Sequence, residues 1–189
     1  MPLLYDDPEN HLDHRIGLSS LLKQQLTGLQ LAPDAPRPEF ERSAAFFVEV
    51  HGALRDYSAR LPEGLRALVD APADQRSTLH SAHRSAPVAR HLVQLAHNHH
   101  TVEDDHYFPK FVQAMPTLAN AIDLLEGDHL ILDATLDQVA TTMALVRKNP
   151  ADLDALARAL QPAEALQKLL QRHLADEEEI IMPVFALLA

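Results

Sequence analysis

The sequence predicts an all-α protein, an antiparallel four-helix bundle with an additional N-terminal helix. Only five of the 189 residues are glycine, whereas alanine and leucine, both strong helix formers, are abundant. β-Branched residues never alternate with polar residues over the length of a strand. The thirteen prolines fall mostly in groups, and the stretches between these groups are long enough for helices joined by short connections.

The N-terminal region is expected to flank the bundle. A first helix is predicted over residues 9–29, and the proline-rich linker "LAPDAPRP" follows it. Residues 1–38 are therefore expected to form the flanking helix and linker, and residues 39–189 the bundle domain.

Four longer helices are predicted after the linker. The first should end before "LPEG", and the second, which follows the loop "APADQRS", has Pro87 placed for a first helical turn. The connection "NPAD" separates the last two. Their expected ranges are about 39–60, 87–107, 118–148 and 153–181.

Helical spacing predicts which positions face the core. In the 87–107 helix these are Leu92, Leu95, His99, Val102 and His106, with Glu103 beside them. In the 118–148 helix they are Ile122, Leu125, His129, Leu132, Leu136 and Val139. In the last helix they are Leu166, Leu170, His173, Glu177 and Ile180. Histidines and carboxylates thus interrupt apolar faces, and burying them is costly unless they are paired or bind a metal.

Two segments of the chain repeat one pattern. "HHTVEDDHYFP" begins at His99 and "HLADEEEIIMP" begins at His173; both have Glu at +4, acids at +5 and +6, and Pro at +10. Each copy follows a solitary histidine on the preceding helix, His51 in "FFVEVHGAL" and His129 in "EGDHLIL". The chain therefore resembles two copies of one helical pair, each contributing a histidine and then His-x-x-x-Glu.

This spacing predicts a metal site. Residues i and i+4 lie on one helix face about 5–6 Å apart, so an imidazole and a carboxylate can reach one ion. The predicted ligands are His51, His99, Glu103, His129, His173 and Glu177. With both glutamates bridging, and with an oxide or hydroxide bridge, this set serves two metal ions and leaves room for a small ligand. Mixed nitrogen and oxygen ligands favour iron, with manganese and zinc as further candidates.

Several neighbouring polar residues have simpler interpretations. His97 and His106 are expected to make surface contacts or to support the ligands, and His100 is close enough to be an additional ligand. Asp104 and Asp105 are also expected to be supporting residues. Asp176, Glu178 and Glu179 are typical of a solvated helix face. If all of these groups formed ion pairs only, the chain would be a metal-free helical interaction module.

Composition excludes other classes of site and partner. The chain has no cysteine, which rules out disulfides and thiolate metal sites. A net charge of −11 with scattered basic residues argues against nucleic acid as a partner. The short apolar runs and the N-terminus "MPLLYDDPEN" predict neither a membrane span nor a signal peptide, so a cytoplasmic location and no membrane partner are expected.

Together, "FFVEVHGAL", "HHTVEDDHYFP", "EGDHLIL" and "HLADEEEIIMP" resemble the hemerythrin-like, or HHE cation-binding, family over about residues 40–188. The resemblance includes Phe108–Pro109 and Met182–Pro183, where the second and fourth helices of the family end. It implies an up-and-down four-helix bundle around an oxide- or hydroxide-bridged pair of iron ions, held by the six residues predicted above.

The sequence departs from the oxygen-carrying members of the family. They place a second histidine four residues after the ligand at His129, where this chain has Asp133, itself a further candidate ligand. They place the last carboxylate at +5, which would select Glu178, whereas the repeat favours Glu177. His14 could replace His51 in the family pattern, but His51 would then have no role. His11 and His14 are therefore expected on a flanking surface or in a cap.

The leading functional hypothesis is a non-haem di-iron protein that binds or senses dioxygen, peroxide or nitric oxide, or that handles iron. A sensor of this kind would act through a protein partner or by forming a homodimer. A small di-iron oxidase or peroxidase is the alternative, but neither a substrate cavity nor an electron source is recognisable in the sequence. We therefore expect a binding protein rather than an enzyme.

Overall fold

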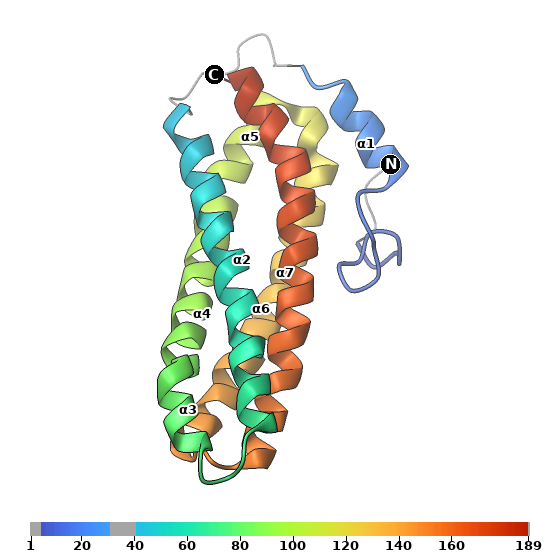
Figure 1. The fold of residues 1–189 in the computed structure, drawn as a ribbon. Helices are drawn as coiled ribbons and strands as arrows, with labels where there is room; N and C mark the ends of the chain where they lie inside the picture. Colours follow the sequence, from blue (N-terminus) through green and yellow to red (C-terminus); the bar gives the residue numbers. More distant parts are fainter. Residues whose placement is uncertain (1–4, 31–40, 189) are drawn as a thin grey trace. The chain divides into compact units, whose positions relative to one another are not determined.

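The computed structural model describes residues 5–30 and 41–188, and every regular element within these ranges is a helix. Figure 1 follows the helices along the chain. They are α1 (Ser20–Thr27), α2 (Glu41–Asp70), α3 (Arg76–His83), α4 (Ser85–Val102), the π-helical turn η1 (Glu103–Tyr107), α5 (Phe108–Ala114), the 3-10 turn η2 (Pro116–Leu118), α6 (Ala119–Lys148) and α7 (Leu153–Leu188). The predicted fold class, a helical bundle with an N-terminal helix, is confirmed.

The chain forms two compact units, and each long helix contributes residues to both. The first unit comprises Met1–His51, His99–Ile131 and Gln171–Ala189, and the second comprises Gly52–Asn98 and Leu132–Leu170. The six predicted metal ligands all belong to the first unit.

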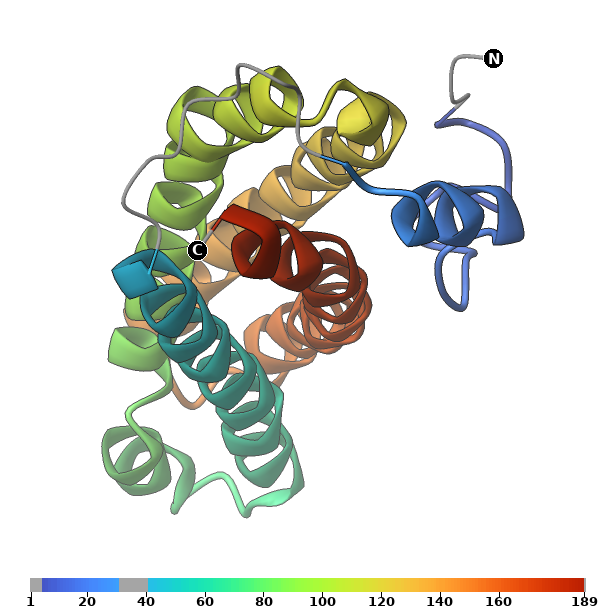
Figure 2. The same ribbon diagram turned by 90° about the horizontal axis from the view of Figure 1, so that it is seen from above.

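An aromatic and aliphatic core fills the first unit. Phe108, Phe111 and Met115 are fully buried on and after α5, and Phe185 of α7 packs edge-on against Phe111. Short helix α1 joins this core through Leu22 and contacts η2. Figure 2 shows the same ribbon from above. Two rings of this core, Phe47 and Phe108, pack against His51 and His129, respectively.

The predicted N-terminal helix over residues 9–29 is wrong in its first half. Residues 5–19 form a series of turns, and α1 begins only after Ser19, whose Oγ accepts a hydrogen bond from the backbone of Leu22. Arg15 explains the difference, because its side chain turns into the interior and donates to the carbonyl oxygen of Asn10 at 2.7 Å. The linker at 31–38 and the expected domain boundary at 38/39 lie outside the described residues.

The predicted end of the first bundle helix at Arg60 is also wrong, because α2 continues through Pro62 to Asp70. A proline inside a helix removes one hydrogen bond and costs about 3 kcal/mol. Leu61, Leu65 and Leu68 are almost completely buried. Their burial continues the apolar face past the proline and offsets its cost.

The second bundle helix begins as predicted but does not end at Tyr107. Pro87 lies in the first turn of α4, after the separate short helix α3. Beyond α4 the chain passes through the π-helical turn η1 into α5, so Pro109 lies at the start of a helical segment rather than after one. In this turn the N–H of Phe108 donates to the carbonyl oxygen of Glu103, five residues earlier.

The last two bundle helices lie close to their predicted ranges. Helix α6 ends at Lys148 as expected, whereas α7 continues past the predicted end, through Pro183 to Leu188. The core positions predicted in α6 and α7 are all buried. In the 87–107 stretch, Val102 and His106 are exposed, so their predicted core placement is wrong. Within the described part of the chain, we find no helix that combines the length and apolarity needed to cross a membrane.

Candidate metal centre

Seven buried side chains with metal-binding donors meet in the first unit. Helix α2 supplies one histidine, α4 two, α6 one, and α7 a histidine and a glutamate, while the second glutamate opens η1. They form two groups, and within each group the donor atoms all lie within 4.8 Å of one another. The groups are His51, His99, Glu103 and Glu177, and His100, His129 and His173.

The first group brings two imidazoles and two carboxylates together. The Nε2 atoms of His51 and His99 are 3.1 Å apart. Oε1 of Glu103 lies 3.1 Å from Nε2 of His99, and Oε2 of Glu177 lies 3.2 Å from Nε2 of His51. Donors that bind one ion through bonds of about 2.1 Å lie about 3 Å apart when the bonds meet at a right angle. These separations therefore suit a shared ion.

The second group consists of three histidines, and both glutamates reach towards it. The rings of His100 and His129 stack with centroids 4.2 Å apart. Oε2 of Glu103 lies 3.5 Å from Nε2 of His129, while its Oε1 faces the first group. Oε2 of Glu177 lies 3.5 Å from Nε2 of His173. Two carboxylates placed between two sets of imidazoles are suited to bridging a pair of ions.

The π-helical turn η1 starts at Glu103 and distinguishes the two sequence copies. Single π-helical turns inside α-helices occur frequently at functional sites. His173 and Glu177 lie on uninterrupted α7, whereas in the other copy the α-helix that carries His99 ends at Val102 and the π-helical turn begins at Glu103. The two copies are therefore not equivalent in structure, although both place His and Glu four residues apart.

Several donor atoms are buried without a hydrogen-bond partner. These are both carboxylate oxygens of Glu103 and of Glu177, and the Nε2 atoms of His129 and His173. The nearest imidazole nitrogens to the carboxylates are at ion-pair distances, but the contacts lack hydrogen-bond geometry. Leaving such polar groups unsatisfied costs about 1–3 kcal/mol each. A bound cation would satisfy several of them at once, so the donor set fits a metal.

Opposite pKa shifts separate the two glutamates. Burial, together with the charge of Glu177, raises the pKa of Glu103 well above its usual range. Burial alone would also raise the pKa of Glu177, but contact with His51 and the charges of His99 and His173 lower it well below that range. Burial lowers the pKa of His99, which favours the neutral imidazole that binds metal ions.

Carboxylates hold the outer nitrogens of three of these histidines. Nδ1 of His129 lies 2.8 Å from Asp104, and Nδ1 of His51 lies 2.9 Å from Glu178. Nδ1 of His173 lies 3.1 Å from Asp128. Such contacts fix the ring orientation and leave the Nε2 atom to bind a metal ion, an arrangement typical of metal-binding histidines.

Asp128 is itself part of a buried network. Arg15 and Tyr5 donate hydrogen bonds to its carboxylate at 2.6 and 2.7 Å. Burial by itself would raise the pKa of Asp128, but hydrogen bonds from Arg15 and His173 lower it. Burial and the charge of Asp128 raise the pKa of Tyr5. The aspartate is therefore charged when it faces His173.

The structure brings the six predicted ligands together and adds His100 to them. Glu178 contacts the outer nitrogen of His51 and does not join either donor group. Asp133 lies 3.2 Å from His97 in the second unit, outside both groups. Asp176, expected on a solvated face, is instead completely buried.

His11 and His14 lie within the N-terminal turns and belong to neither donor group. His11 is partly exposed and packs between Tyr5 and His14 at centroid distances of 5.4 Å. The sequence prediction missed Arg15 and Asp128, and it named Asp104 as a supporting residue without identifying the histidine that it contacts. The only local signal was their position next to predicted histidines or glutamates, which does not reveal which ring each one contacts.

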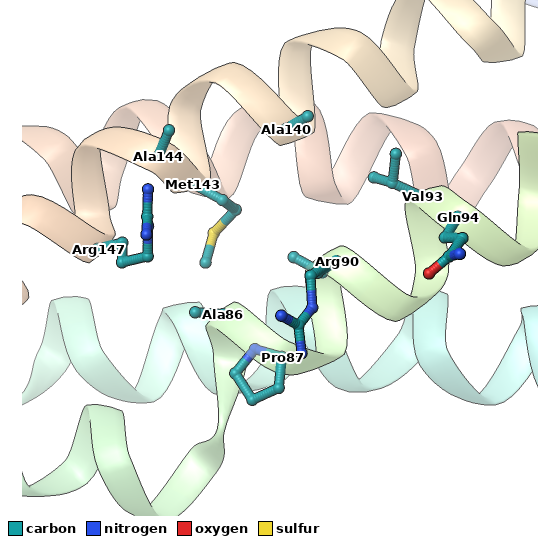
Figure 3. Close-up of a pocket in the computed structure, with 10 residues that line it drawn as sticks. Ala86, Pro87, Arg90, Val93, Gln94, Ala140, Met143, Ala144 and Arg147 are labelled. Carbon is teal, nitrogen blue, oxygen red and sulfur yellow. The ribbon is translucent and has the colours of Figure 1, made fainter.

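The second unit contains a groove of different character (Figure 3). Its volume is about 700 Å³, and small apolar side chains of α4 and α6 line most of it. Its polar groups are Arg90, Gln94 and Arg147. The two guanidinium groups make this groove unsuitable for a cation. Among the residues that the structure describes, both groups of metal-binding donors lie in the first unit.

The fold and the buried histidine–carboxylate cluster define a helical-bundle metal-binding protein. The family model of the hemerythrin HHE cation binding domain matches residues 42–186. The chain belongs to this family. No curated protein and no solved structure matches it significantly.

Proposed function

We propose that this protein is a non-haem di-iron protein that binds or senses dioxygen, peroxide or nitric oxide, or handles iron. One observation carries the proposal: five imidazoles and two carboxylates are buried together in two adjacent groups. A pair of iron ions in this position would supply redox chemistry and an open position for a small ligand. The family supports binding of a cation, and the choice of iron rests on the mixed nitrogen and oxygen donors.

The division of the donors supports two ions rather than one. His51 and His99 face one group, and His100, His129 and His173 form the other. Glu103 and Glu177 reach from the first group towards the second and would neutralise part of the charge of two cations. The residues of this chain would thus bind the ions, orient the imidazoles through outer carboxylates and exclude bulk water by burial.

We propose a binding or sensing role rather than catalysis, in the cytoplasm. The groove in Figure 3 belongs to the second unit. The described residues that line it include no histidine or carboxylate that could act on a substrate. Reduced protein should therefore undergo one stoichiometric oxidation by peroxide. Many turnovers would instead support the oxidase or peroxidase alternative.

Metal analysis of protein produced with iron supplementation tests the proposal. We expect about two iron ions per chain, and absorption changes typical of ferric charge transfer when anaerobically reduced protein meets oxygen. The double variant His99→Ala/His173→Ala should bind no iron, whereas His11→Ala/His14→Ala should bind as the wild type does. If wild-type protein contains no transition metal and chelation leaves its stability unchanged, the chain is a metal-free helical module.

A further inference from the structure

Arg15 is a buried cation in the N-terminal turns. Its side chain is 1% exposed, and its guanidinium contacts two buried carboxylates. Nε lies 2.8 Å from Asp176, and Nη1 and Nη2 contact the two oxygens of Asp128. Nη1 also donates to the carbonyl oxygen of Asn10 at 2.7 Å. The planar fork of arginine matches a carboxylate in this two-point manner.

Asp128 connects this arginine to a candidate metal ligand. The oxygen that Arg15 Nη2 contacts, Oδ2, also lies 3.1 Å from Nδ1 of His173. The other oxygen, Oδ1, accepts hydrogen bonds from Arg15 and from the hydroxyl of Tyr5 at 2.7 Å. Arg15 and Tyr5 therefore fix the carboxylate that holds the outer nitrogen of His173.

A second set of contacts fastens the same turns to α7. Arg172 donates to Asp176 at 2.9 Å and to the backbone oxygen of Ile16 at 2.8 Å. Asp176 thus lies between Arg172 and Arg15, and the chain around Arg15 is held at both backbone and side chain. By contrast, Lys23 reaches Glu179 at 3.4 Å through side chains that are about half exposed.

Gly127 makes room for the tyrosine. A β-carbon added at Gly127 would lie 2.6 Å from Cε2 of Tyr5, closer than real side chains approach. The same addition at Gly52 would meet nothing within 4 Å. The surface of α6 beside Asp128 is therefore shaped to receive Tyr5.

We propose that residues 5–28, here called the N-terminal segment, complete the metal centre from outside the matched family domain, with Arg15 as a positioning residue for His173. This inference rests on the metal-binding function proposed above. The segment precedes the family match at residues 42–186. Arg15 acts through Asp128, which orients the imidazole so that its Nε2 faces the donor groups. Docking of the segment and retention of the ion in the His173 group are consequently coupled.

Arg15→Gln in the full chain tests this coupling. The probe is Co²⁺, whose visible absorption reports the geometry of its ligands, with affinity measured by competition against a chelator. Outer partners of metal-binding histidines typically contribute about 10–100-fold to affinity. We expect a loss in this range and an altered visible spectrum. Lys23→Ala is the matched control, because it removes an ion pair of the same segment without touching Asp128.

The conservative variant separates positioning from charge. Arg15→Lys keeps the positive charge but loses the two-point fork, so we expect affinity between those of wild type and Arg15→Gln. In a double-mutant cycle, Arg15→Gln should weaken Co²⁺ binding little further once Asp128→Asn is present. If Arg15→Gln keeps wild-type affinity and spectrum, or if the two substitutions are simply additive, Arg15 does not position His173.

If the Arg15→Gln variant does not fold, Gly127→Ala provides a second test of the inference. Alanine favours helix α6, so the substitution should displace Tyr5 while preserving the helix. We expect Co²⁺ affinity to fall by about tenfold relative to Gly52→Ala, the matched control. Equal affinity of the two glycine variants would overturn the inference in that case. A wild-type chain that binds no Co²⁺ or iron would instead reject the proposed metal function, a result distinct from either failure.

Discussion

Nδ1 of His129 lies 2.8 Å from Oδ1 of Asp104, a residue of the π-helical turn that begins at Glu103. The turn thus supplies both a carboxylate for the donor groups and the carboxylate that holds a histidine of another helix. In a regular α-helix, the residues after Glu103 would point in other directions around the helix axis than they do after the π-helical turn. The local change of register is therefore linked to the orientation of His129.

Asp104→Ala should weaken metal binding without unfolding the protein. His129 would lose the partner of its outer nitrogen, and such losses typically reduce metal affinity about 10–100-fold. Asp105→Ala is the control, since its side chain is exposed in the same turn. Chelator competition with Co²⁺ measures both variants. Equal affinities would show that Asp104 does not orient His129.

His100→Ala should remove a ligand, whereas His97→Ala should not. His100 is buried and stacks on His129, while His97 contacts Asp133 on the second unit. We expect His100→Ala to lower the affinity of one of two Co²⁺ ions by more than about tenfold, as judged from the effect of outer partners alone.

The variant Asp133→Ala tests the other additional ligand that the sequence suggests. It should leave both Co²⁺ ions bound with unchanged affinity. A loss of one ion in Asp133→Ala, with none in His100→Ala, would contradict the assignment of His100 to the centre.

Helical periodicity and the internal repeat predicted most of the donor set. His99, His129 and His173 lie on the predicted inner faces because the 3.6-residue period fixes which positions share a side. His51 was predicted because it precedes the first copy of the repeat as His129 precedes the second. The repeat favours Glu177 over its acidic neighbours, because Glu177 lies four residues after His173 as Glu103 does after His99. Both rules act within one helix, where spacing along the chain determines spacing in space.

Prolines and distant ion pairs were beyond these rules. The grouped prolines predict helix ends, but buried leucines after Pro62 outweigh the lost hydrogen bond, and the π-helical turn leads into Pro109. Arg15 and Asp128 are 113 positions apart, so no local pattern pairs them. A single chain sequence offers no signal that connects a flanking arginine to an aspartate beside a predicted ligand.

The adjacent acids Glu177 and Glu178 should respond differently to substitution. Glu177 is fully buried between the donor groups, whereas Glu178 is partly exposed and contacts the outer nitrogen of His51. Glu177→Gln should abolish binding of at least one Co²⁺ ion, because a neutral amide is a poor bridge between cations. Glu178→Gln should retain both ions with affinity reduced by about tenfold. The reverse order would assign the bridging role to Glu178.

Removal of the metal should destabilise the first unit. A ligand that binds only the folded state stabilises it by about 2.7 kcal/mol at 100 times its Kd. For a chain of this size, that corresponds to a Tm change of about 5–10 °C. The donors join α2, α4, α6 and α7 within the first unit, so amide exchange after chelation should increase there more than around the groove of the second unit.

The control is the double variant His99→Ala/His173→Ala. It should show no change in Tm or in amide exchange when the chelator is added, because it no longer binds the metal. A chelator-induced change of equal size in this variant would place the stabilising ion elsewhere.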